Sequence, residues 1–212
     1  MILVSKVDHS NNDCLLVAVM SHGKDGGKLL SADRHYYHTE ELWKNFVGSK
    51  CESLVGKPKL FFIQACRGGI IDFGVSLTER NTIEENAEIE KGILIPNYDD
   101  LMIMYSTSEG HKSLRDKIHG SWFIEYLCGE LKSNSQDDLM RILMRVSRKV
   151  AVDCEGFMTG EKFARKQMPS IVSNLTKLVY FPTFTNQSCQ NCDPPSQVSA
   201  HSFEEIHKID YR

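Results

Sequence analysis

The sequence has no long hydrophobic segment, little proline and no strong excess of charge. Charged residues interrupt every apolar run of the 212 residues, whereas a membrane-spanning helix needs roughly 18 or more consecutive apolar residues. Six prolines and 14 glycines do not support a collagen-like or disordered chain. Because 25 basic residues nearly balance 28 acidic ones, a strongly basic nucleic-acid-binding surface is not supported either. These absences predict a globular domain that binds no nucleic acid and no membrane.

The amino terminus lacks the features of a secretory signal, and the cysteines do not suggest a disulfide framework. Met1–Lys6 has neither the basic start nor the apolar stretch of about 7–15 residues that marks such a signal. The seven cysteines are odd in number and lie mostly within apolar runs, as is typical of reduced thiols. We therefore expect a cytoplasmic protein, and the chain length predicts one domain. The cysteines are Cys14, Cys51, Cys66, Cys128, Cys154, Cys189 and Cys192.

Short apolar runs bounded by turn residues predict strands. They cover residues 14–20, 60–65, 101–105 and 178–181. Continuous apolar runs of this length are typical of strands buried on both faces in a parallel sheet. The sequence therefore predicts a mostly parallel sheet whose two faces are both covered.

Helical patterns lie between and after these strands. They cover residues 39–46, 121–131, 136–153 and 159–166. Thr39 and Ser135 are the predicted caps of the first and third helices, because hydroxyl side chains can accept hydrogen bonds from the first backbone N–H groups. Alternating strands and helices predict an α/β sandwich with helices on both faces of one sheet.

Two segments have no convincing period. Residues 68–92 are long for a connection within a domain and are interpreted as a linker, and the polar, proline-broken residues 185–212 predict a disordered tail. The tail carries residue types that bind zinc, at Cys189, Cys192, His201 and His207. Their spacing is shorter than that of the usual zinc finger, so the disordered tail is preferred and no metal site is predicted.

The most specific motifs follow two of the predicted strands directly. Ser21-His22-Gly23 follows the first strand and Gln64-Ala65-Cys66-Arg67-Gly68 follows the second. Functional side chains of α/β sheets project from the carboxyl ends of strands, so His22 and Cys66 are expected to lie close together. A histidine can activate a cysteine as a nucleophile, and the adjacent glycines leave room for a substrate carbonyl oxygen at backbone N–H groups.

Each of the two residues also has an ordinary structural interpretation. Cys66 alone is more often a small buried hydrophobic residue, and His22 alone is more often a hydrogen-bonded surface histidine. Their joint occurrence at two strand ends, each beside a glycine, favours a cysteine–histidine catalytic pair.

These motifs resemble the caspase family, whose signature is Gln-Ala-Cys-(Arg/Gln/Gly)-Gly with a histidine about 50 residues upstream. Further family motifs occur in family order at residues 20–23, 56–68, 105–107, 120–124 and 148–151. The resemblance covers roughly residues 1–184 and is closest to effector-type members. It implies a caspase-like three-layer α/β sandwich from which the first strand and helix of the family domain are missing. That missing region supplies a second pocket arginine in the family.

The resemblance also implies a subunit organisation. The catalytic domain, residues 1–184, divides into a partial large subunit at 1–67, an intersubunit linker at 68–94 and a small subunit at 95–184, followed by the tail at 185–212. Family zymogens mature by cleavage after a linker aspartate. Between Gly68 and Asn97 the only aspartate is Asp72, which lies so close behind Cys66 that cleavage there is expected to be sterically poor.

The resemblance assigns catalytic roles to three residues. Cys66 is the nucleophile, and His22 protonates the leaving amine. The backbone N–H groups of Gly23 and Cys66 form the oxyanion hole. No metal or organic cofactor is implied.

The family cleaves after aspartate, whose carboxylate fits a pocket with cationic and amide donors. The resemblance assigns this pocket to Arg115 and Gln64, with Ser21 and Ser113 as supporting hydroxyls. Without the resemblance, Arg115 would be interpreted as an ordinary loop arginine. The remaining assignments concern the outer subsites: Trp122 lies near them, and Leu114 replaces an aromatic residue that is usual in effector-type relatives.

The resemblance thus predicts a cysteine endopeptidase that cleaves after aspartate in intracellular proteins, similar to an apoptotic executioner and made as a zymogen. Its expected partners are protein substrates with an exposed aspartate, caspase activators or inhibitors, and a second copy of itself. The homodimer contact is expected at the strand predicted for 178–181. The alternative is a catalytically silent or truncated homologue that regulates caspases by dimerisation.

Overall fold

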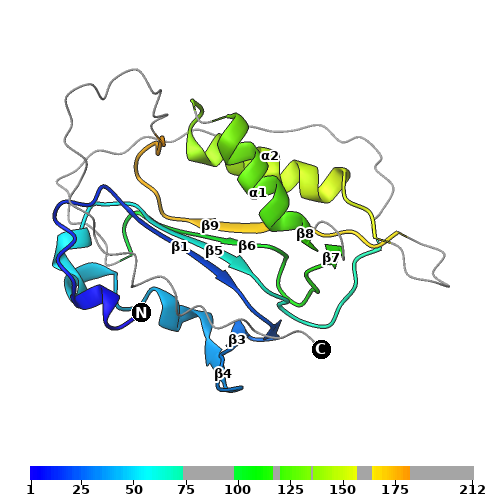
Figure 1. Cartoon of the computed structure of the whole chain (residues 1–212), viewed down its shortest axis with the longest axis horizontal. Helices are drawn as coiled ribbons and strands as arrows, with labels where there is room; N and C mark the ends of the chain where they lie inside the picture. The colour runs from blue at the N-terminus through cyan, green and yellow to red at the C-terminus, as the bar shows by residue number, and fades with distance from the viewer. Residues whose placement is uncertain (74–97, 117–119, 135, 157–163, 182–212) are drawn as a thin grey trace, which may run out of the picture.

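A four-stranded sheet forms the centre of the computed structural model (Figure 1). The structure describes residues 1–73, 98–116, 120–134, 136–156 and 164–181. In spatial order the strands are β1 (Leu15–Met20), β5 (Lys59–Gln64), β6 (Leu101–Tyr105) and β9 (Ser170–Ser173). The first three are parallel, and β9 runs antiparallel to β6. The mostly parallel α/β sheet predicted from the sequence is confirmed.

The central strands β5 and β6 are buried on both faces because their alternate side chains enter two separate cores. Leu60 and Phe62 of β5 face one core, whereas Phe61 and Ile63 face the other. β6 alternates in the same way, and Leu60 pairs in register with Met102. A continuous apolar run is what such a doubly covered strand requires.

The helices α1 (Trp122–Ser133) and α2 (Leu139–Val152) cover one face of the sheet. The apolar residues of α2 recur at three- and four-residue spacing, which places them on the side that packs on the sheet. Its cap is Asp138, whose carboxylate accepts hydrogen bonds from the backbone N–H groups of Met140 and Arg141 at 3.0 and 3.4 Å. The predicted start at 136 is therefore wrong, and the predicted cap Ser135 lies outside the described residues.

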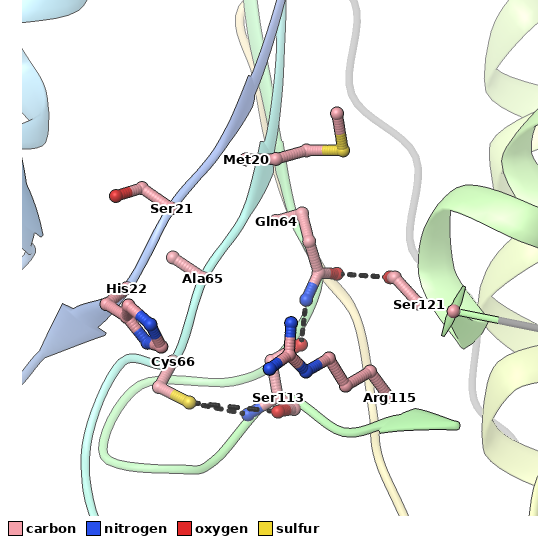
Figure 2. A pocket seen from close by; sticks show the side chains of 10 residues that line it. Met20, Ser21, His22, Gln64, Ala65, Cys66, Ser113, Arg115 and Ser121 are labelled. Atoms are coloured by element: carbon pink, nitrogen blue, oxygen red, sulfur yellow. Dashed lines mark hydrogen bonds between the residues drawn. The ribbon is translucent and has the colours of Figure 1, made fainter. Parts of the chain in front are cut away.

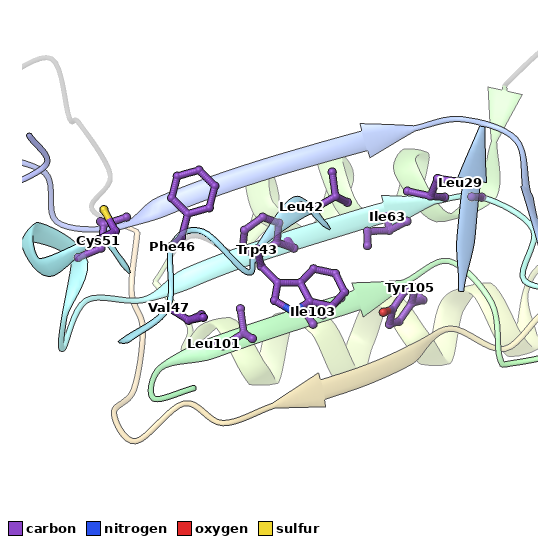
Figure 3. Packing of buried hydrophobic residues seen from close by; sticks show 13 residues of the cluster. Leu29, Leu42, Trp43, Phe46, Val47, Cys51, Ile63, Leu101, Ile103 and Tyr105 are labelled. Carbon is purple, nitrogen blue, oxygen red and sulfur yellow. The ribbon is translucent and has the colours of Figure 1, made fainter. Parts of the chain in front are cut away.

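Short 3-10 helices and an irregular chain cover the other face (Figure 3). The residues that pack there come from η2 (Thr39–Leu42), η4 (Glu52–Leu54) and the chain between them, whereas the described residues of η1 (Val4–Lys6) and η3 (Gly48–Lys50) add none to this core. The α-helix predicted for 39–46 is thus wrong, because only one 3-10 turn forms and its N-cap is His38, without a side-chain cap. The aromatic side chains that follow this turn dock on the sheet: the Trp43 and Phe61 ring centroids lie 5.9 Å apart. This packing gives the chain its helix-like pattern without a regular helix.

Two small antiparallel sheets flank the carboxyl ends of the central strands. One contains β2 (Gly23–Lys24), β3 (Lys28–Leu30) and β4 (Tyr36–His38), and the other contains β7 (Arg115–Asp116) and β8 (Gly120–Ser121). Both begin close to the motifs singled out above, because β2 follows His22 directly and β7 follows Leu114.

β1 is an edge strand, and its burial on both faces was wrongly predicted. Its side chains alternate between half-buried and exposed positions, with Leu16 46% and Met20 63% exposed. The core beneath α1 and α2 takes its strand residues from β5, β6 and β9 and contains none from β1 among the described residues. Among the described residues, the face of β1 that carries Leu16 and Met20 is therefore left uncovered, whereas Leu15, Val17 and Val19 pack on the other core.

The carboxyl-terminal strand lies earlier in the chain than predicted. Residues 178–181 form no strand; instead Val179 is buried against the start of α2, where its carbonyl accepts a hydrogen bond from Leu139 N at 2.7 Å. The strand at this edge of the sheet is β9. The prediction that residues 178–181 form the strand through which two copies pair is therefore also wrong.

Other predicted segments fall partly or wholly outside the described residues. Residues 164–166 of the helix predicted for 159–166 are not helical, since Arg165 and Lys166 form bridges with Gly156 and Asp72. The rest of that segment, the linker beyond residue 73 and the tail at 185–212 are not described. In the described ranges, no helix is long and apolar enough to cross a membrane.

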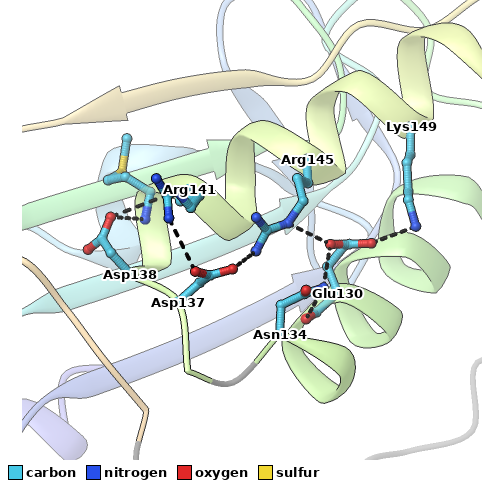
Figure 4. Close-up of polar contacts among 8 residues, drawn as sticks. Glu130, Asn134, Asp137, Asp138, Arg141, Arg145 and Lys149 are labelled. Atoms are coloured by element: carbon cyan, nitrogen blue, oxygen red, sulfur yellow. Dashed lines mark hydrogen bonds and ion pairs between the residues drawn. The ribbon is translucent and has the colours of Figure 1, made fainter.

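A buried carboxylate joins the two α-helices (Figure 4). Glu130 on α1 is 4% exposed and binds Lys149 and Arg145 of α2 at 2.6 and 3.1 Å. Asn134 donates a further hydrogen bond to it at 2.8 Å. The hydrogen bond from Lys149, opposed by burial and supported by Arg145, lowers the pKa of Glu130 below its usual value. The charged form of this carboxyl therefore stabilises the packing of α1 on α2.

Replacing Glu130 by Gln is expected to lower the free energy of unfolding by roughly 1.5–3 kcal/mol at pH 7, because charge-assisted hydrogen bonds are lost. Since the pKa of Glu130 is lowered in the folded state, its contribution is complete above its unfolded pKa of about 4.3 and is lost as the pH falls through the folded value. Denaturant unfolding of both proteins at several pH values measures this. A difference in the free energy of unfolding between the two proteins that widens below about pH 4.3 would contradict the assignment.

Candidate active site

The register of β1 and β5 brings the two predicted catalytic residues to the same edge of the sheet. Met20 pairs with Gln64, and the ladder continues through a 3.0 Å hydrogen bond from Ser21 N to Gln64 O. His22 and Cys66 each lie two residues beyond this last pair. Both line a pocket of about 370 Å³ (Figure 2). The sequence-based expectation that they lie close together agrees with this arrangement.

The β2–β3 hairpin holds the backbone on either side of His22. Ser21 Oγ donates to the carbonyl of Leu30 at 2.6 Å, and Leu30 N donates to the carbonyl of His22 at 2.9 Å. Figure 2 shows the His22 imidazole on the same side of the pocket as Cys66. Ser21 lines the pocket, but its hydroxyl group is used to fix the hairpin.

Gly23 has to be glycine because the backbone of Cys66 approaches it closely. A Cβ atom built on Gly23 would lie 2.1 Å from the Cys66 carbonyl oxygen, well inside van der Waals contact. A side chain at this position would therefore push the two strand ends apart. The structure thus gives a direct steric reason for glycine at position 23.

The thiol of Cys66 contacts the backbone of the opposite pocket wall. Ser113 N donates to Cys66 Sγ at 3.4 Å, and the thiol lies 3.7 Å from the carbonyl of Ser113 as its acceptor. Cys66 is only half-buried, so the sulfur can be reached from the pocket. An N–H group that donates to sulfur stabilises negative charge on it.

The Gln64 amide is held by one hydroxyl group at each end. Ser121 Oγ donates to its Oε1 at 2.6 Å, while its Nε2 donates to Ser113 Oγ at 2.9 Å. Ser121 also caps α1, because its Oγ accepts a hydrogen bond from Ile124 N at 3.3 Å. The amide is therefore fixed in the pocket with its Nε2 directed toward Ser113.

Arg115 completes a group of polar side chains in the same pocket. It is exposed, lies on β7, and lines the pocket together with Gln64 and Ser113. A guanidinium beside an amide donor and a hydroxyl group suits a small carboxylate.

The structure places Trp122 differently from the other predicted residues. It is the first residue of α1 and is absent from the pocket lining. Its indole packs near Gly156, where an added Cβ would lie 3.1 Å from the ring. The sequence interpretation missed four other lining residues, Met20, Ala65, Gly120 and Ser121. Of these, Ser121 carried a signal as a potential helix cap, but its contact with Gln64 depends on the folded arrangement.

The segment after Cys66 is also anchored firmly. The Arg67 guanidinium lies 3.9 Å from the centre of the Tyr105 ring and pairs with Glu109. Its backbone donates to His111 O at 2.9 Å and accepts from Gly110 N at 3.0 Å. These contacts join the chain after Cys66 to the segment that leads to Ser113.

Cys66 and His22 thus lie just beyond adjacent parallel strand ends of an α/β sandwich and share one pocket with Arg115. The caspase domain matches residues 2–180, and the chain therefore belongs to the caspase family. It is 40% identical over 177 residues to caspase drICE of Drosophila melanogaster, and the match covers 82% of this chain and 51% of that protein. It is 42% identical to caspase-3 of Bos taurus, with 84% and 63% covered.

A solved structure is similar to this chain in fold as well as in sequence. The crystal structure of caspase-1 from Spodoptera frugiperda superposes with a TM-score of 0.73 at 39% identity, and the match covers 84% of this chain and 66% of that one. The chain spans about half the length of drICE. The caspase-like α/β sandwich expected from the sequence is confirmed.

Proposed function

We propose that this chain is a cysteine endopeptidase that hydrolyses peptide bonds after aspartate. The observation that carries the proposal is one pocket that contains Cys66 and His22 together with Arg115 and Gln64. The first pair suits acyl transfer, and the second pair suits a carboxylate side chain next to the bond that is cut.

In the proposed reaction His22 takes the proton of the Cys66 thiol, and the Cys66 thiolate attacks the carbonyl carbon of the substrate and forms a tetrahedral intermediate. The backbone N–H groups of Gly23 and Cys66 stabilise its oxyanion. As the C–N bond breaks, His22 donates a proton to the leaving amine, and a thioester remains on Cys66. Water then hydrolyses the thioester, which releases the carboxylate product and regenerates the thiol.

The aspartate carboxylate binds to Arg115 and to the Gln64 amide. Ser113 supports this pocket through its hydrogen bond with Gln64. Ser21 supports it through the hairpin that holds His22. Trp122 serves outer subsites at the start of α1.

We also propose that the chain is organised as a partial large subunit (1–67), a linker (68–94) and a small subunit (95–184). Asp72 makes a poor processing site, since its carbonyl accepts a hydrogen bond from Lys166 N at 2.8 Å. Cleavage there would require this bridge to open. A homodimer is proposed through β9, whose far side carries no strand among the described residues. The substrates are intracellular proteins with exposed aspartates, and the role resembles that of an apoptotic executioner.

The test compares tetrapeptide substrates that end in Asp or Asn before the same fluorogenic amine. The Asp peptide is expected to have a kcat/KM at least about 100-fold higher, because a site built for a charged group leaves its donors poorly paired with a neutral one. The chain is assayed beside a longer one carrying any coding sequence upstream of Met1. Equal hydrolysis of the two peptides would contradict aspartate specificity. No turnover by either folded protein would instead favour the silent regulator.

A further inference from the structure

A buried glutamine outside the pocket connects the two segments that form it. Gln167 is 1% exposed, and both ends of its amide are used. Its Oε1 accepts a hydrogen bond from Leu114 N, and its Nε2 donates to the carbonyl of Ser106 at 2.8 Å. A buried amide with both ends paired has one fixed orientation.

The first partner lies in the middle of the pocket wall. Leu114 is between Ser113, which contacts Cys66 and Gln64, and Arg115, which lines the pocket. The Leu114 side chain is not needed for this contact, because its backbone N–H group is the donor. The Gln167 amide therefore holds the backbone from which the pocket residues project.

The second partner is fixed to the strand that leads to Cys66. Ser106 N donates to the carbonyl of Ile63 at 2.9 Å. Its Oγ lies 3.3 and 3.2 Å from the backbone N and O atoms of Ala65. Ser106 is thus joined to the backbone immediately before Cys66, and Gln167 connects it to Leu114.

Gln167 is itself held on both sides along the chain. Lys166 N donates to Asp72 O at 2.8 Å, and Ser170 at the start of β9 pairs with Tyr105. Gln167 does not line the pocket. Any effect on the reaction must therefore pass through Ser113, Leu114 and Arg115.

We propose that Gln167 is a positioning residue that fixes the distance between the Cys66 strand end and the Ser113–Arg115 wall. This rests on the proposed function. By holding Leu114 N, the Gln167 amide keeps the Ser113 N–H group on the Cys66 sulfur and Arg115 at the carboxylate pocket. Misplacement of such groups by about 1 Å can cost up to 100-fold in rate.

The test uses two substitutions in the 212-residue chain. Gln167→Met keeps the length of the side chain but removes both hydrogen bonds. Gln167→Glu keeps an oxygen that accepts from Leu114 N but replaces the Nε2 donor to Ser106 O by a second carboxylate oxygen, so it breaks only the Ser106 half of the connection. Glu130→Gln is the matched control, because it removes a buried polar interaction between α1 and α2 without touching the pocket.

Two readouts distinguish positioning from a purely structural role. For Gln167→Met we expect KM for the aspartate peptide to rise about tenfold, with a smaller fall in kcat, because the carboxylate contact is lost in ground and transition states alike. We also expect iodoacetamide to alkylate Cys66 at least about threefold more slowly, since the N–H group no longer stabilises charge on the sulfur. Gln167→Glu should shift both quantities in the same directions, because it breaks the Ser106 half of the connection, and Glu130→Gln should lower only the thermal midpoint.

The alkylation rate needs no peptide hydrolysis, so it tests the positioning role even if the chain cleaves no substrate. The proposal is overturned if folded Gln167→Met matches the wild type within about twofold in KM and in alkylation rate. It is also overturned if Glu130→Gln, at an equal loss of thermal midpoint, changes these two quantities as much. Should Gln167→Met fail to fold, Gln167→Glu decides: KM and alkylation rate shifted by at least about threefold support the connection, and values within about twofold of the wild type reject it.

Discussion

Replacing Cys66 by Ala is expected to abolish hydrolysis of the aspartate peptide, with a fall in kcat of at least about 10⁴-fold, because the acyl intermediate can no longer form. The fold should survive the change. Cys66 is half-buried, and its sulfur forms hydrogen bonds with the backbone of Ser113. Initial-rate kinetics under reducing conditions, beside a thermal unfolding curve of each protein, measure both quantities.

The matched control for this prediction is Cys128→Ala. Cys128 lies exposed on α1, away from the pocket lining, so its loss should leave kcat and KM unchanged. Residual turnover above about one part in 10⁴ in folded Cys66→Ala, beyond what a trace of wild-type protein accounts for, would sink the nucleophile assignment.

Arg115→Met is expected to lower kcat/KM for the aspartate peptide by about 10²–10³-fold, equivalent to about 3–4 kcal/mol. The physical reason is that the substrate carboxylate is still desolvated on binding but no longer meets a cationic partner. Because Arg115 is exposed, the thermal midpoint should change little. The kcat/KM of Arg115→Lys should lie between those of the wild type and Arg115→Met, since an ammonium keeps the charge but not the bidentate geometry of a guanidinium.

Two comparisons make this prediction specific. Arg148→Met removes an exposed arginine of α2 and should leave the kinetics unchanged. Arg115→Met should also reduce the preference for the Asp peptide over the Asn peptide, because the charge that distinguishes them is gone. A uniform fall for both peptides would mean that Arg115 supports the pocket without contacting the carboxylate.

The parts of the fold that the sequence predicted well are those whose pattern reflects burial alone. β5 and β6 are doubly covered and therefore continuously apolar, while α2 has its apolar side chains at helical spacing on one side. In each case the residues that the sequence pattern predicts to be buried are buried in the fold. The parallel pairing of β1 with β5 then brought His22 and Cys66 to one edge, as their positions after the strands suggested.

The wrong predictions arose where the same residue types serve a different purpose. Trp43 and Phe46 are spaced as in a helix, but they are there to cover Phe61. Val179 is apolar because it packs at the start of α2, and its neighbours Leu178 and Tyr180 are exposed. β9 carries only two apolar residues between two serines, so its sequence gave little sign that it completes the sheet.

The candidate site was predictable only where chemistry and position coincide in the chain. Cys66, His22 and Gln64 directly follow or end strands, and their residue types suggest a reaction. Ser121 and Gln167 are common polar residues whose importance lies in contacts across 57 and 53 positions of sequence, with Gln64 and Leu114 respectively. Such contacts follow from the packing of α1 and β9 on the sheet, which local patterns do not specify.

Covalent labelling tests the central claim most directly. The chain is treated with a peptidyl fluoromethyl ketone that ends in aspartate, or with the matched asparagine compound, and the modified residue is located by mass spectrometry. The proposed site predicts one thioether at Cys66, formed much faster with the aspartate compound and slowed by Arg115→Met. Labelling of another cysteine, or equal rates with the two compounds, would contradict a cysteine nucleophile beside a carboxylate pocket.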